Sequence, residues 1–162
     1  MAESGIAGLF VCGGFQFLGN YYKDADDRTI KGLEIFNLYT KSLSENLPRL
    51  IGDIVIEANL GEEKLSKIVG FENHGGRTYL QSGFSPFGKV LKGHGNNDEG
   101  YEGARYKNWF GTYLHGPILP KNPNLADYLI KLALDVDKLE TIDNNLENKT
   151  QFLIAKKLGI AI

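Results

Sequence analysis

Hydrophobic and polar positions follow strand-like patterns over most of the chain and helical spacing at a few points. Short apolar or alternating runs predict strands at Ala7–Val11, Leu33–Thr40, Ile51–Ala58, Lys67–Glu72, Phe87–Lys92, Ala104–Lys107 and Trp109–Leu114. Residues 93–103 are rich in Gly, Asn and Asp, which is typical of a turn. We therefore expect Phe87–Lys92 to pair with Ala104–Lys107 across it.

Helical spacing of apolar residues is present in three segments. Gly13–Tyr22 directly follows the first predicted strand, whereas Asn124–Asp135 and Lys149–Leu158 lie near the end of the chain. Asp24–Arg28 is predicted to be a polar loop, and Ser44–Arg49 a connection. Strands mixed with helices predict an α/β fold with a central mixed sheet.

The composition narrows the class of function. The chain has 162 residues, which predicts one domain, 1–162. Its formal net charge of −2 indicates neither nucleic-acid binding nor an anionic membrane surface. No apolar run reaches the roughly 18 residues of a membrane-spanning helix, and the first residues lack the pattern of a signal peptide. A single cysteine cannot form an internal disulfide, so we expect a cytoplasmic protein.

The most informative chemistry lies at that cysteine. The first apolar run ends at Cys12, two glycines follow, and helical spacing begins behind them. Strand, tight turn and helix is the geometry of a nucleophile elbow, and a helix N-terminus favours the thiolate. The alternative is a buried structural cysteine beside a glycine turn, and this segment alone leaves both interpretations open.

Three histidines follow predicted strands. His115 lies where the strand Trp109–Leu114 gives way to Gly-Pro, so it is placed at the end of a sheet, where a cysteine nucleophile needs a base. His74 and His94 lie in glycine-rich loops, and for His94 we favour an ordinary turn histidine. The histidines and Cys12 are too dispersed for the ligand spacing of a zinc site.

Several motifs carry a resemblance to a known family. Residues 11–16 read Val-Cys-Gly-Gly-Phe-Gln and resemble the nucleophile motif of class I glutamine amidotransferases. Residues 70–78 and 113–117 resemble the cobyric-acid-synthase-like branch. Residues 49–57, 95–98 and 116–122 are similar to the glutaminase subunits of lipid II isoglutaminyl synthases. The resemblance implies a layered, flavodoxin-like α/β fold and hydrolysis of L-glutamine to glutamate and ammonia.

The resemblance also implies a role for each matching residue. Cys12 is the expected nucleophile, His115 its general base and acid, and Gly13 the donor of a backbone N–H to the oxyanion. Gln16 and Arg49 are expected to hold the glutamine. The guanidinium of Arg49 suits the α-carboxylate because it can form bidentate hydrogen bonds with it.

The loop around His74 is expected to shape the substrate pocket. Its two following glycines suggest close backbone approach rather than proton transfer.

Partners follow from the same resemblance. Ammonia is expected to pass to a Mur-ligase-like subunit that uses ATP and Mg to amidate the D-glutamate of lipid II. No cofactor is expected in this chain, and neither a nucleic-acid partner nor a membrane-spanning segment. The alternatives are the glutaminase part of a corrinoid-amidating synthase, a different cysteine hydrolase, and a non-catalytic scaffold that binds the ligase.

The sequence departs from the wider family at two places. Many class I amidotransferases carry Glu two residues after the catalytic histidine, but here that position is Pro117. The family also has several strands before its elbow, whereas this chain reaches Cys12 at once. We therefore expect a domain that lacks its N-terminal strands, with one oxyanion donor missing and low activity in isolation.

Overall fold

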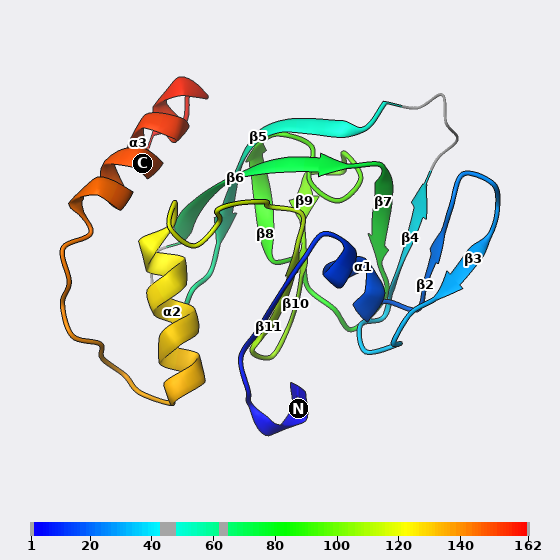
Figure 1. The fold of residues 1–162 in the computed structure, drawn as a ribbon, viewed down its shortest axis with the longest axis horizontal. Coiled ribbons are helices and arrows are strands. Elements are labelled where there is room, and N and C mark those ends of the chain that lie inside the picture. Colours follow the sequence, from blue (N-terminus) through cyan, green and yellow to red (C-terminus); the bar gives the residue numbers. More distant parts are fainter. Residues whose placement is uncertain (1, 43–47, 62–64, 162) are drawn as a thin grey trace.

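The computed structural model describes residues 2–42, 48–61 and 65–161, and the predicted connection Ser44–Arg49 lies mostly outside these residues. Strands dominate, with one short helix early and two helices at the end (Figure 1). The elements are a 3₁₀ turn η1 (Ala2–Ser4), β1 (Gly8–Val11), α1 (Gly13–Leu18), β2 (Tyr21–Lys23), β3 (Thr29–Lys31), β4 (Leu38–Ser42), β5 (Leu50–Ala58), β6 (Ser66–His74), β7 (Gly76–Leu80), β8 (Gly88–Lys92), β9 (Tyr101–Glu102), β10 (Ala104–Tyr106), β11 (Trp109–Thr112), α2 (Pro123–Leu134) and α3 (Asn145–Lys157). The predicted α/β class is confirmed.

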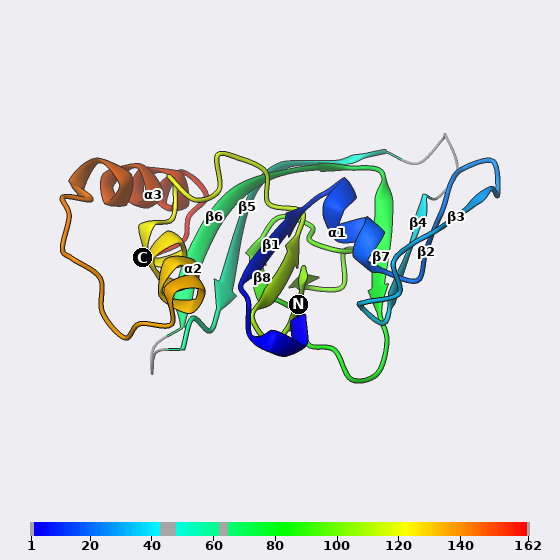
Figure 2. The ribbon, with the colours of Figure 1, turned by 60° about the horizontal axis from the view of Figure 1, so that its bottom comes forward.

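The strands form three sheets. The first has the order β1-β11-β10, with β1 parallel to β11 and β10 antiparallel to it. The second has the order β3-β2-β4-β7, and the third the order β6-β5-β8-β9. Parallel and antiparallel pairs therefore occur together, as predicted, but they are divided among small sheets. Two views show α1 leaving the end of β1 beside β7 (Figures 1 and 2).

The hydrophobic core lies between the first and third sheets. Alternate residues of β5 and β6 (Ile54, Ile56, Ile68) pack with Phe110 of β11 and with Leu125 of α2. The opposite face of the third sheet, with Val55 and Val69, packs against Ala155 of α3. A second cluster surrounds α1 and consists of Phe15, Leu18, Phe36, Leu38, Ala104, Trp109 and Tyr113.

The prediction of a helix over Gly13–Tyr22 is wrong at its end. The helix stops at Leu18, because Tyr21–Lys23 pairs with two strands, β3 and β4. Aromatic side chains favour this pairing, since Tyr21 stacks on Tyr39 with ring centroids 5.3 Å apart. Only the second half of the predicted strand Leu33–Thr40 is extended. Its first half binds the end of α1 through main-chain hydrogen bonds.

The predicted pairing of Phe87–Lys92 with Ala104–Lys107 is also wrong. Strand β8 pairs with β5 and β9, whereas β10 pairs with β11 in another sheet. Gly103 explains the change of sheet: its φ of +64° turns the chain, and a Cβ there would lie 2.3 Å from the carbonyl oxygen of Gly111. The strands β5, β6 and β11 and the helix α2 lie close to their predicted positions. Among the described residues, no helix is long and apolar enough to cross a membrane.

Candidate active site

Cys12 lies in the sharp turn between β1 and α1. Its φ of 53° and ψ of −110° are rarely adopted by a residue with a side chain, and it forms the N-cap of α1. The Cys12 N–H donates to the carbonyl oxygen of Thr112 at 2.9 Å, which ties the turn to β11. This is the strained strand-to-helix geometry of a nucleophile elbow.

The turn leaves room around the thiol. Cys12 is a free, half-buried cysteine, and Gly13 and Gly14 are exposed. A Cβ at Gly13 would meet no atom within 4 Å, so the side of the turn next to Cys12 is open. The open side of the turn therefore borders the half-buried thiol and the first residues of α1.

His115 is held by main chain, and no carboxylate among the described residues bonds to its ring. Its Nδ1 lies 3.2 Å from the carbonyl oxygen of Phe71, which also accepts the His115 backbone N–H at 2.7 Å. A carbonyl has no proton to give, so Nδ1 must carry the hydrogen of this bond. Nε2 is then the nitrogen without a hydrogen, and in the part of the chain that the structure describes it has no hydrogen-bond partner.

The parallel pair of strands brings the two groups to one end of the first sheet. Val11 is the register partner of Thr112, so Cys12 directly follows the end of β1 and His115 follows the end of β11. The carboxyl ends of parallel strands meet at the same edge, which is where α/β sites lie. The structure therefore places Cys12 and His115 at the same edge.

A buried carboxyl supports the segment between Thr112 and His115. Thr112 Oγ1 lies 3.1 and 3.0 Å from the two oxygens of Glu102, and the Tyr113 N–H donates to Glu102 Oε1 at 2.6 Å. Burial raises the pKa of Glu102 from 4.5 to about 8, against the opposing effect of the bond from Tyr113. The carboxyl is therefore mostly protonated at neutral pH and adds little charge to the core.

Arg49 lies at the beginning of the third sheet and is exposed. Its Nε donates to Asn73 Oδ1 at 2.9 Å and its Nη2 to the Asn73 carbonyl at 3.0 Å. Asn73 thus fixes one edge of the guanidinium. Within the described residues Nη1 makes no hydrogen bond, and the contact of Arg49 with an α-carboxylate stays a prediction.

Gln16 lies one helical turn after Cys12, and its main-chain N–H donates to the Cys12 carbonyl at 3.0 Å. Its side-chain Nε2 donates to the hydroxyl of Tyr113 at 3.0 Å. The predicted substrate-binding amide is therefore adjacent to the elbow and already anchored at one end.

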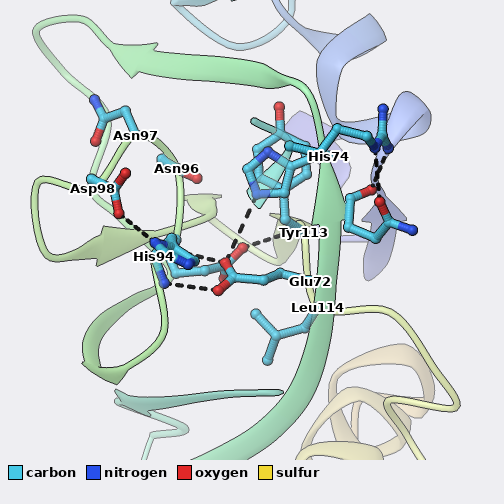
Figure 3. A network of polar contacts seen from close by, with 12 residues as sticks. Glu72, His74, His94, Asn96, Asn97, Asp98, Tyr113 and Leu114 are labelled. Atoms are coloured by element: carbon cyan, nitrogen blue, oxygen red, sulfur yellow. Dashed lines mark hydrogen bonds and ion pairs between the residues drawn. The ribbon is translucent and has the colours of Figure 1, made fainter. Parts of the chain in front are cut away.

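His74 is buried, with 1% of its surface exposed, and lies beneath Tyr113. Its ring stacks on the Tyr113 ring with centroids 3.6 Å apart, and its Nδ1 lies 2.7 Å from the Gly76 carbonyl oxygen. Its Nε2 lies 3.9 Å from Glu72, too far for a hydrogen bond (Figure 3). With so little of its ring exposed, His74 contributes to the pocket chiefly through its neighbours.

Glu72 lies between His74 and a surface turn. Its two oxygens accept the backbone N–H groups of His94 and Gly95 at 2.8 and 2.9 Å. The His94 ring lies in that turn, as predicted, and its Nδ1 is 2.6 Å from Asp98 Oδ1 (Figure 3). His94 is therefore engaged away from the elbow.

Sequence reasoning missed Tyr113, Glu72 and Glu102 as site residues. A signal for Glu72 was present, because Ile68, Gly70, Glu72 and His74 alternate along one strand and all four are buried. A carboxylate on the core face of a strand requires dedicated hydrogen-bond donors. The partner of His115 left no signal, since a backbone carbonyl has no side-chain identity.

A cysteine in a strand-to-helix elbow, with an imidazole at the same end of the sheet, is the arrangement that cysteine-dependent hydrolases and amidotransferases use. The chain belongs to the CobB/CobQ-like glutamine amidotransferase family, whose domain matches residues 1–123. The resemblance inferred from the motifs is thereby confirmed.

Particular relatives are similar over most of the chain. Lipid II isoglutaminyl synthase (glutamine-hydrolyzing) subunit GatD of Staphylococcus aureus is 47% identical over 150 residues, which cover 92% of this chain and 58% of that protein. The subunit of the same name from Streptococcus pneumoniae is 48% identical over 127 residues, covering 78% of this chain and 47% of that protein. A probable cobyric acid synthase of Methanosphaera stadtmanae is 34% identical over 114 residues, or 65% of this chain and 22% of that protein. The chain thus spans about half the length of the two GatD proteins.

The backbone strain at Cys12 predicts an unusual order of stabilities. Cys12→Gly and Cys12→Ala both remove the thiol, but only glycine adopts positive φ without a steric penalty. We expect Cys12→Gly to exceed Cys12→Ala by about 1 kcal/mol in the free energy of unfolding, measured by urea titration. At the exposed Ser82, whose φ is not positive, the order of the two substitutions should be reversed. Equal stabilities at position 12 would show that the turn is unstrained.

The raised pKa of Glu102 predicts a pH dependence of stability. Between pH 4.5 and about 8 the carboxyl is ionised in the unfolded chain but protonated in the folded one. The unfolded state then binds fewer protons, so this group makes stability fall as the pH rises through that window. Glu102→Gln should flatten the decline in urea midpoint, whereas the exposed Glu140→Gln should leave it unchanged. An unaltered slope in Glu102→Gln would mean that Glu102 is ionised in the fold.

Proposed function

We propose that this chain hydrolyses glutamine with Cys12 as nucleophile and His115 as general base and acid. The observation that carries the proposal is the strained elbow at Cys12, at the same end of the sheet as an imidazole whose Nδ1 is bonded to a main-chain carbonyl. The family supports the same reaction, because its members are glutamine amidotransferases.

The first half of the reaction forms a thioester. His115 Nε2 takes the thiol proton, and the Cys12 sulfur attacks the side-chain amide carbon of glutamine. The carbonyl oxygen becomes an oxyanion, which the Gly13 N–H at the start of α1 is positioned to stabilise. The protonated Nε2 then donates its proton to the leaving nitrogen, and ammonia departs.

The second half releases glutamate. His115 Nε2 takes a proton from a water molecule, the resulting hydroxide equivalent attacks the thioester carbon, and the sulfur leaves as the thiolate. The Phe71 carbonyl keeps Nδ1 protonated in both halves, so the same nitrogen acts as acid and as base. Glu102 supports this arrangement from below through Thr112 and Tyr113.

The fate of the ammonia belongs to the same proposal. The similar GatD proteins are named as subunits of a glutamine-hydrolysing lipid II isoglutaminyl synthase. We propose a Mur-ligase-like partner that uses ATP and Mg to transfer this ammonia to the D-glutamate of lipid II. Supply to a corrinoid-amidating synthase is the second candidate, favoured by the 34% identity to a probable cobyric acid synthase.

Ammonia release from glutamine by the full chain, alone and with the partner, tests the reaction. Cys12→Ser and His115→Ala should each lower kcat by more than about a thousandfold, because the two residues act as a unit. His94→Ala should retain comparable activity, since its ring is engaged by Asp98 away from the elbow. Activity that survives in Cys12→Ser would overturn covalent catalysis at this site. Activity that is lost in His94→Ala but not in His115→Ala would reassign the base.

Arg49 tests recognition of the α-carboxylate. Arg49→Ala should raise KM for glutamine by about tenfold and change kcat little, because this contact is the same in the ground and transition states. Arg49→Lys should rescue only partly, since lysine lacks the planar fork. Arg28→Ala, at an exposed arginine paired with Asp26, is the matched control. An unchanged KM in Arg49→Ala would make Arg49 an ordinary surface charge.

A further inference from the structure

The side chain of Gln16 is constrained by a chain of buried hydroxyl groups. Gln16 Nε2 donates to the Tyr113 hydroxyl at 3.0 Å, and that hydroxyl lies 2.6 Å from Thr78 Oγ1. Thr78 Oγ1 in turn lies 2.7 Å from Thr40 Oγ1. Thr40, Thr78 and Tyr113 are almost completely buried, so water does not replace these bonds.

The hydroxyl of Tyr113 has a fixed protonation state. Burial raises the pKa of Tyr113 to about 12, so the group has one proton to donate and lone pairs to accept with. Because it accepts the Gln16 amide hydrogen, its own proton is available for Thr78. With Gln16 as the donor to Tyr113, a Tyr113 hydroxyl that donates to Thr78 continues the hydrogen bonds from Gln16 into the core.

The ring of Tyr113 is clamped from two sides. His74 stacks on it with an interplanar angle of 6°, and Phe15 packs edge-on at a centroid distance of 5.3 Å. The hydroxyl of Tyr113 therefore has little freedom to move.

The backbone at Gly76 forms another wall around the Gln16 amide. A Cβ at Gly76 would lie 3.1 Å from Gln16 Nε2 and 2.5 Å from Thr40 Cγ2, so only glycine leaves space for the amide. The carbonyl of Gly76 is bound by His74 Nδ1 at 2.7 Å. His74 thus supports both surfaces that enclose the amide nitrogen: the Tyr113 ring and the Gly76 backbone.

We infer that Tyr113 is a positioning residue for substrate selection, and that it fixes the rotation of the Gln16 carboxamide so that the amide oxygen is left to accept an N–H group of the substrate. Within the part of the chain that the structure describes, that oxygen has no hydrogen bond, whereas the nitrogen has one. The inference rests on the proposed glutaminase function. It adds a residue that never touches the reacting atoms.

The fixed orientation has a chemical consequence. A rotated amide would present its NH₂ group to the substrate and would then prefer an acceptor, such as a carboxylate oxygen. An amide held with its oxygen outward prefers a donor, which glutamine has in its side-chain amide and in its α-ammonium group. Loss of the Tyr113 hydroxyl should therefore weaken glutamine binding without changing the chemical step.

The test compares Tyr113→Phe with the wild type in the full chain. This change keeps the ring between His74 and Phe15 and removes only the hydroxyl. We expect KM for glutamine to rise about fivefold to tenfold, the usual effect of one hydrogen bond, with kcat within about twofold. Tyr79→Phe removes the hydroxyl of the residue that follows Thr78 on β7, which takes no part in these bonds, and should leave both constants unchanged.

A binding measurement without turnover accompanies the kinetics. Glutamine should protect Cys12 from alkylation by iodoacetamide, and Tyr113→Phe should need about fivefold to tenfold more glutamine for half protection. The rate of alkylation without glutamine should match the wild type, which shows that the elbow is intact. Thr78→Val, which breaks the next link and leaves Tyr113 in place, should change KM in the same direction but less.

The outcomes distinguish the positioning role of Tyr113 from the proposed glutaminase function. Unchanged KM and half-protection values in Tyr113→Phe would overturn the positioning role and leave Tyr113 as a core residue. A fall in kcat with unchanged KM would overturn it as well, because it would place Tyr113 at the chemical step. Absence of Cys12-dependent ammonia release in the wild type would overturn the proposed function, whereas half-protection values would still show whether Tyr113 orients Gln16 for binding.

Discussion

The parallel pairing of β1 with β11 is the constraint on which the candidate site depends. These strands share one register, and the hydrogen bond from Cys12 to Thr112 extends it by one residue into the elbow. The proposed nucleophile and base are therefore brought together by one ladder of main-chain bonds. A shift of register by one residue would separate them and would turn the side chains of β1 to the opposite face.

A second constraint is the cost of burying polar groups beneath the site. Glu72 and Glu102 are completely buried. Glu72 accepts two N–H groups of the surface turn. Glu102 is bonded to Thr112 and to the Tyr113 N–H, and its raised pKa keeps it mostly uncharged. Such groups are stabilising only while every partner stays in place. The site is thus supported by a network that accepts little substitution, and the surface turn 93–98 belongs to it.

The sequence predicted features that depend on a few consecutive residues, such as the elbow at Cys12. Cys12 followed by two glycines was recognisable because an elbow needs a nucleophile at the end of a strand and small residues behind it. The change of sheet between β9 and β10 at Gly103 could not be predicted. The periodicity of a strand does not reveal which sheet it joins after a residue of positive φ. Tyr113 and Glu102 were missed for a related reason: they were read as an ordinary strand residue and an ordinary turn residue, and only tertiary packing shows that both are buried.

The bond from His115 to the carbonyl of Phe71 has an evolutionary consequence. An orienting aspartate or glutamate disappears with one codon change, whereas a main-chain carbonyl is present whatever amino acid occupies position 71. The orientation of the proposed base therefore does not depend on the chemical identity of the side chain at position 71. An alanine scan would detect the thiol and the imidazole but would overlook the Phe71 carbonyl, which only an altered backbone, such as an ester in place of an amide, would expose.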